Sequence, residues 1–154
     1  FAKNLGLSER DMKSFCIGML LHDLGKTRIS PDILNKKDSL TRDEYETIKM
    51  HPEWGARAIK ETGESFTDEY AVILQHHENC DGSGYPYGLK KNEIHYSARI
   101  VRIIDIYDAL TTRRSYSNPQ EPYNSLKLIR DEMYNAVDQT MLKSFIRFLG
   151  GHRG

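Results

Sequence analysis

The 154-residue sequence lacks several features that would define a broad class of protein. It has no net charge, because 22 lysines and arginines balance 22 aspartates and glutamates, so its overall field does not favour duplex nucleic acid or an anionic membrane. It has no hydrophobic stretch near the roughly 18 residues of a membrane span. Its two cysteines, Cys16 and Cys80, lie far apart, which favours a reduced, cytoplasmic domain. An anionic ligand must therefore be attracted by local charge, most obviously by bound metal.

The composition predicts one compact domain. Hydrophobic residues make up 38% of the chain and charged residues 29%, which is typical of a globular domain of this length. The chain begins with Phe1, and residues 1–5 resemble the last turn of a helix closed by Gly6. We therefore expect a single domain, residues 1–154, that is the C-terminal part of a longer protein.

Apolar periodicity and capping signals predict an all-α fold. Thr41 and Glu44 form a capping-box pattern, which starts a helix that we expect to carry His51. Ser30 followed by Pro31 predicts another short helical start. The remaining helices are expected at about 8–24, 67–77, 97–112, 123–135 and 140–149. Glycines and a proline interrupt residues 78–92, which we predict to be a loop.

Histidines and aspartates carry the strongest chemical signal. His22 precedes Asp23, His51 stands alone, and His76 precedes His77. Neighbouring helical residues point about 100° apart, so the paired histidines are expected to reach two neighbouring ions rather than one. The Asp23 carboxylate could bridge two such ions. Mixed imidazole and carboxylate ligands suit iron, manganese or zinc better than calcium or magnesium.

Simpler interpretations remain for each of these residues alone. Asp105 lies in the apolar stretch 100–107, where a buried carboxylate requires a metal or a partner, and Arg99 or Arg102 could be that partner. His51 could be a helix-end or surface histidine, and His22 with Asp23 a polar helix terminus. Their joint occurrence favours a metal site.

Two motifs give the sequence a family resemblance. Residues 22–26, HDLGK, are similar to the HDxGK signature of HD-superfamily phosphohydrolases, and residues 76–86, HHENCDGSGYP, match the HHExxDGxGYP signature of the HD-GYP branch. Residues 33–36, 50–52 and 98–111 also resemble family segments in the expected order. The resemblance covers roughly residues 5–116.

The resemblance implies a compact helical HD-domain bundle that hydrolyses cyclic di-GMP, or a related cyclic dinucleotide, to linear pGpG and in some members to GMP. It implies two divalent metal ions, iron or manganese, and leaves a third open. The implied metal ligands are His22, Asp23, His51, His76, His77 and Asp105. Asp23 and Lys26 would be catalytic, with Lys26 contacting the scissile phosphate. Arg114 aligns with a ligand-contacting arginine, although Ser115 and Ser117 depart from its usual neighbours.

The expected chemistry follows from two adjacent cations. Metal ions about 3.5–4 Å apart can share a water, lower its pKa from 15.7 towards about 7, and stabilise the attacking and leaving oxygens of an in-line displacement. The bridging hydroxide would be the nucleophile. Lys26 would add positive charge at the phosphoryl oxygens. Without the motif around it, Lys26 would be interpreted as a solvated lysine that follows a glycine.

The loop allows more than one role. Gly84, Tyr85 and Pro86 could form the lip of a pocket, with Tyr85 contacting the substrate. The family resemblance implies that the same loop could bind a GGDEF-domain protein. A plain structural turn is the simpler alternative.

Two other functions of the domain also remain possible interpretations of the sequence. One is a catalytically weak module that binds a cyclic dinucleotide or a GGDEF partner, and the other is a different HD-superfamily nucleotide phosphohydrolase. The complete HHExxDGxGYP motif favours the phosphodiesterase.

Overall fold

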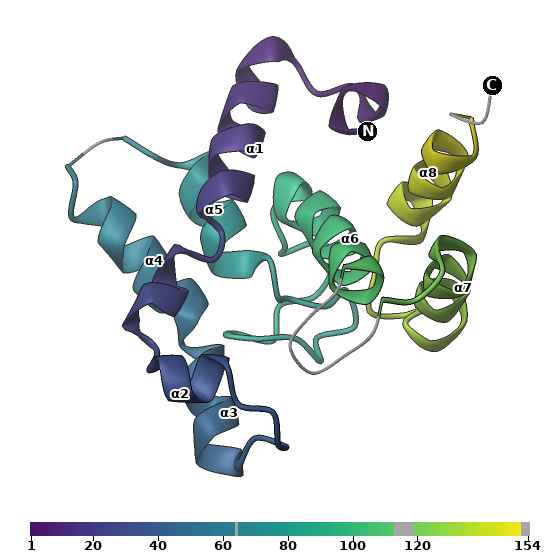
Figure 1. Ribbon diagram of the computed structural model, residues 1–154. Helices are drawn as coiled ribbons and strands as arrows, with labels where there is room; N and C mark the ends of the chain where they lie inside the picture. The colour runs from purple at the N-terminus through teal and green to yellow at the C-terminus, as the bar shows by residue number, and fades with distance from the viewer. Residues whose placement is uncertain (64, 113–118, 152–154) are drawn as a thin grey trace.

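The computed structural model describes residues 1–63, 65–112 and 119–151, which form helices joined by loops (Figure 1). The helices are α1 (Glu9–Leu21), α2 (Pro31–Leu34), α3 (Arg42–Lys49), α4 (His51–Lys60), α5 (Asp68–Gln75), α6 (Tyr96–Thr111), α7 (Pro122–Glu132) and α8 (Gln139–Gly150). Two 3₁₀ helices, η1 (Ala2–Leu5) and η2 (Leu24–Arg28), flank α1. Within the described ranges the only β contact is an isolated bridge between Asp81 and Lys90, so the all-α prediction is confirmed.

The predicted helix starts at Thr41 and Ser30 are confirmed. The Thr41 hydroxyl accepts a hydrogen bond from the Glu44 amide at 3.3 Å, and the Glu44 carboxylate accepts one from the Thr41 amide at 2.6 Å. Ser30 caps α2, with Pro31 in the first turn. These bonds satisfy amides that a helix start leaves without an internal partner.

Two predicted boundaries near the candidate site were wrong. The first long helix ends at Leu21, and Asp23 lies between it and η2. The helix that starts after Thr41 ends at Lys49, so His51 begins α4 instead of continuing α3. Pro52 explains the second break, because it has no amide hydrogen to donate to the Ile48 carbonyl as a continuous helix would require, and that carbonyl faces the His51 ring instead.

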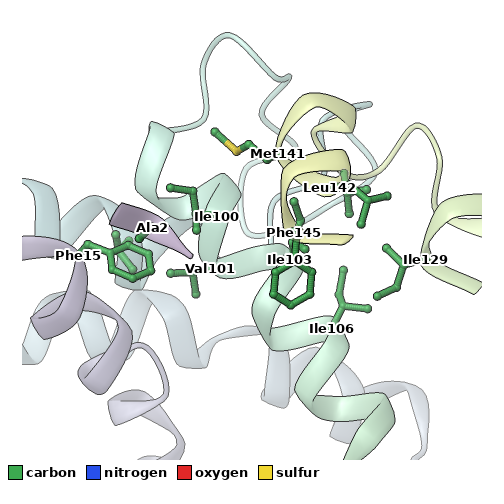
Figure 2. Packing of buried hydrophobic residues seen from close by; sticks show 12 residues of the cluster. Ala2, Phe15, Ile100, Val101, Ile103, Ile106, Ile129, Met141, Leu142 and Phe145 are labelled. Atoms are coloured by element: carbon green, nitrogen blue, oxygen red, sulfur yellow. The ribbon is translucent and has the colours of Figure 1, made fainter. Parts of the chain in front are cut away.

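The main core surrounds α6. Ile100, Val101 and Ile103 of this helix are fully buried. Figure 2 shows them among apolar side chains from both ends of the chain, including Phe15 of α1 and Phe145 of α8. Burial of each isoleucine contributes roughly 1.5–3 kcal/mol relative to an exposed position. The helix that carries Asp105 is therefore firmly held.

A second, smaller core lies between α4 and α5. It contains Ala56 and Ile59 of α4 with Ile73 and Leu74 of α5. Because α5 also packs against α1 and α6, its C-terminal end lies close to the ends of the other helices that carry site residues.

Cys16 and Cys80 are both free thiols. Among the described residues, no helix combines the length and apolar character needed to cross a membrane.

Candidate metal centre

Four potential metal ligands converge where α1, α4 and α5 meet. Asp23, His51, His76 and His77, here called the ligand cluster, each place one ligand atom within 4.8 Å of the others. The adjacent rings of His76 and His77 both belong to this cluster, with centroids 4.1 Å apart, and their binding to two neighbouring ions stays a prediction.

Gly25 explains how the HD motif approaches His51. A Cβ atom at this position would lie 1.9 Å from the His51 carbonyl oxygen and 2.6 Å from the Gly55 amide nitrogen. Both neighbours are backbone atoms, so neither can rotate away. The glycine of the HDxGK motif therefore permits η2 to lie directly against the first turn of α4, with Asp23 beside His51.

Backbone carbonyl groups at the C-terminal ends of three helices orient the rings of three histidines. In each case the Nδ1 atom lies 2.6–2.7 Å from a carbonyl oxygen three residues earlier. The pairs are His22 with Met19, His51 with Ile48, and His76 with Ile73. These carbonyls belong to last helical turns, where they lack an internal partner. Since a carbonyl only accepts, Nδ1 carries the hydrogen and Nε2 of the neutral ring is left with a lone pair for a metal.

The Asp23 carboxylate faces two groups of ligands. Its Oδ1 atom lies 3.4 Å from Nε2 of His51 and 3.9 Å from Nε2 of His76. Its Oδ2 atom lies 3.4 Å from Nε2 of His22 and 2.7 Å from Nζ of Lys26. One carboxylate thus faces two imidazoles through one oxygen and a third imidazole through the other, so it would be able to contact two ions.

The donor set fits a divalent transition metal. The Nε2 atoms of His51 and His76 are 3.1 Å apart, and both carry lone pairs because their Nδ1 hydrogens bind backbone carbonyls. The Oδ1 atom of Asp23 is buried and has no hydrogen-bond partner among the described residues. Electron-rich atoms facing one another in a buried space repel unless a cation lies between them. Imidazole and carboxylate donors favour iron, manganese or zinc.

Burial and charge set the protonation states that such a metal requires. Burial lowers the pKa of His76 to about 3 and also lowers the pKa of His77 far below its ordinary value. Burial opposes ionisation of Asp23, but His22 and Lys26 outweigh it and hold the carboxyl pKa well below its usual range. Burial also lowers the pKa of His22, yet Asp23 outweighs it and the net shift is upward. His76 and His77 therefore offer neutral imidazoles, and Asp23 offers an ionised carboxylate.

His77 and Asp105 lie together at the α6 side of the site. The Nδ1 atom of His77 is 3.9 Å from Asp105 and 3.2 Å from the Arg102 guanidinium. Arg102 also donates to the Asn79 side chain at 3.0 Å. The proposed pairing of Asp105 with Arg99 is not observed, because Arg99 binds Asp138 at 2.7 Å. Arg102 is absent from the predicted site, although its position three residues before Asp105 places both on one helix face.

The loop after His77 is held by a buried carboxylate. Glu78 is 2% exposed, and its two oxygens accept hydrogen bonds from the amides of Tyr87 at 2.7 Å and Leu89 at 2.9 Å. A Cβ atom on Gly84 would lie 2.3 Å from the Asn79 amide nitrogen, so no side chain fits there. The loop conformation consequently depends on residues of its own motif.

Tyr85 connects this loop to the ligand cluster. Its ring stacks on His77, with centroids 4.7 Å apart and an interplanar angle of 23°. Burial raises the pKa of its hydroxyl. Tyr85 lines a cavity of about 780 Å³ that also reaches Lys26, His51 and His77. The predicted residue Arg114 lies outside the described residues.

Residues 1–141 match the HD domain family. This chain belongs to that family. HD domains bind divalent metal ions, and the ligand cluster of this chain could hold one. The HHExxDGxGYP motif of residues 76–86, together with the relatives described next, identifies the HD-GYP branch.

Relatives and a solved structure agree with this assignment. The chain is 33% identical over 97% of its length to a cyclic di-GMP phosphodiesterase of Pseudomonas aeruginosa, and 37% identical over 87% of its length to one of Thermotoga maritima. It spans only 36% and 38% of those two proteins. The fold resembles that of an HD-GYP-type protein, Bd1817 of Bdellovibrio bacteriovorus, with a TM-score of 0.79 and 21% identity over 97% of this chain and 47% of that one.

Proposed function

We propose that this domain is a metal-dependent phosphodiesterase that hydrolyses cyclic di-GMP, or a related cyclic dinucleotide, to the linear dinucleotide. One observation carries the proposal: the two oxygens of Asp23 face separate donor groups, His51 and His76 on one side and His22 on the other. The names of the two curated relatives support the choice of substrate. Further hydrolysis to GMP stays a prediction.

The protein groups have distinct roles in this proposal. His51, His76 and His77 would hold one ion, His22 and Asp105 a second, and Asp23 would contact both. Bound divalent ions would acidify a water molecule and neutralise charge on the phosphodiester. Lys26 reaches both Asp23 and the cavity, so its ammonium can hold an anionic phosphodiester against the ligand cluster. Tyr85 forms the wall beside it.

We further propose iron or manganese as the metal, because five or six imidazole and carboxylate donors match their preferences. The test is elemental analysis of protein purified without oxygen, followed by chromatography of products from several cyclic dinucleotides. Wild-type protein should bind about two ions per chain. Zinc or magnesium as the activating metal would contradict this part of the proposal.

Asp23→Ala provides the sharpest test of the site. Because both donor groups depend on this carboxylate, we expect the variant to lose most bound metal and at least about 1,000-fold in turnover. Asp131→Ala is a matched control, since Asp131 is exposed on α7 and its ion pair with Arg130 is a surface contact. Retained turnover in Asp23→Ala would overturn the assignment. Bound cyclic dinucleotide without turnover in metal-loaded wild type would favour the binding module.

A GGDEF-domain protein is our proposed partner for the loop. Tyr87 is 58% exposed, whereas Tyr85 is directed into the cavity, so Tyr87 is the aromatic side chain available to another protein. Titration of a purified GGDEF domain should show weaker binding to Tyr87→Ala than to wild type, with unchanged metal content. Equal binding of the two proteins would remove Tyr87 from the interface. The cytoplasmic location remains a prediction.

A further inference from the structure

A row of rings leads from the ligand cluster along one wall of the cavity. Tyr85 stacks on His77, and its ring centroid lies 6.5 Å from that of His51. The Lys49 ammonium follows, 5.9 Å from the Tyr85 ring and 5.6 Å from the Tyr45 ring. Lys49 is itself neutralised by Glu46 at 2.9 Å. Tyr45 of α3 is therefore held near the outer part of the wall, with half of its surface exposed.

The rest of the lining combines apolar groups with two neighbouring charged residues, Lys37 and Asp38, that have no ion-pair partner in the described part of the chain. Ile33 and Leu34 of α2 supply apolar surface. Lys36 also lines the cavity, but both oxygens of Glu44 bind its ammonium, at 2.6 and 2.8 Å. Lys37 differs, because in the described part of the chain it makes no hydrogen bond or ion pair, and its side chain is exposed at the cavity.

These features match the part of a cyclic dinucleotide that is not cleaved. When one phosphodiester lies at the ligand cluster, the base attached to it is one ribose away and the second phosphodiester lies across the ring. Aromatic faces bind bases by stacking, and an unpaired ammonium binds a phosphate. Tyr45 of α3 and Lys37, which lies between α2 and α3, line the same cavity of about 780 Å³ as Lys26, His51 and His77.

We infer that Tyr45 and Lys37 form an outer subsite, in which Tyr45 stacks on a purine base and Lys37 pairs with the phosphate that is not cleaved. This inference rests on the proposed function. It assigns substrate affinity to α3 and to the segment between α2 and α3, apart from the residues that hold the metal. The subsite favours cyclic dinucleotides over phosphodiesters that carry no base.

The stacking contact is tested with Tyr45→Ala and Tyr45→Phe in manganese-loaded protein. We expect Tyr45→Ala to raise KM for the hydrolysed cyclic dinucleotide about tenfold, with a much smaller change in kcat, and Tyr45→Phe to restore most of the affinity. The effect should be at least about fivefold smaller with a dialkyl phosphodiester such as diethyl phosphate, which carries no aromatic ring to stack. Tyr123→Ala, which removes an exposed tyrosine of α7, is the control.

The charge contact is tested with Lys37→Ala. Its KM should rise and should depend less steeply on salt concentration than that of wild type, because one phosphate contact is lost. Lys143→Ala, which removes an exposed lysine of α8, should follow wild type. Equal salt dependence of Lys37→Ala and wild type would exclude Lys37 from the subsite.

The outcomes separate this inference from the proposed function. If wild type hydrolyses a cyclic dinucleotide but Tyr45→Ala has the same KM, the outer subsite is wrong and the phosphodiesterase assignment stands. If Tyr45→Ala loses metal or affects both substrates equally, Tyr45 is structural and the inference is again wrong. A metal-loaded wild type that cleaves no cyclic dinucleotide overturns both.

Discussion

Replacement of Gly25 by alanine should separate η2 from α4 and disrupt the metal centre. The new Cβ would lie 1.9 Å from the His51 carbonyl oxygen, and ordinary contacts begin near 3.4 Å, so the two segments must move apart by about 1.5 Å. The clashing atoms are all backbone, and overpacking of this kind costs about 3 kcal/mol or more. Since metal ligands tolerate displacements of only about 0.2 Å, metal affinity should fall at least about 100-fold.

Two measurements check this expectation. Urea unfolding of metal-free protein gives the loss of stability, read as a lower midpoint at constant slope. Competition with a chelator gives the metal affinity. Gly150→Ala is the matched control, because a Cβ at the end of α8 meets no atom within 4 Å. Gly25→Ala with stability within about 0.5 kcal/mol of wild type and unchanged metal affinity would refute the close-approach argument.

Two further predictions concern buried groups. The folded pKa of His76 is about 3, below its ordinary 6.5, so the unfolded chain binds a proton that the folded chain does not. Metal-free protein should therefore lose stability as pH falls from 6.5 towards 3, by up to about 1.4 kcal/mol per pH unit, and His76→Gln should flatten this slope in urea unfolding. Glu78→Gln should cost about 1–3 kcal/mol and speed hydrogen exchange at the amides of Tyr87 and Leu89, because one acceptor oxygen becomes a donor facing an amide. Unchanged exchange at both amides would contradict this role of Glu78.

Local signals predicted most of the helices. The Thr41 capping box, Pro31 after Ser30 and the glycines of residues 78–92 act through neighbouring backbone atoms, so their effect can be read without the tertiary structure. His51 was misplaced because two continuous stretches meet at Pro52 with no glycine or polar loop between them. In that case the proline alone decides where one helix ends and the next begins.

The ligand types were predictable, but their arrangement was not. Histidine and aspartate chemistry and two long motifs indicated a metal centre, whereas the division of Asp23 between two donor groups depends on how closely η2 approaches α4. Arg99 shows the same limit. The sequence left it as a possible partner of Asp105, yet its partner is Asp138, which is 39 residues away in sequence. The cavity also required tertiary structure, since α2 and α3 contribute its outer wall.

The bonds from His22, His51 and His76 to the last turns of α1, α3 and α5 have a consequence for folding. Two cations held by these rings, with Asp23 in contact with both, would cross-link three helix termini that are distant in sequence. Fraying of any one terminus would withdraw a ligand, so occupancy of the site and integrity of the helices are thermodynamically linked. At a free metal concentration 100 times the Kd, the linkage adds about 2.7 kcal/mol to stability, and the melting temperature becomes a direct readout of metal supply.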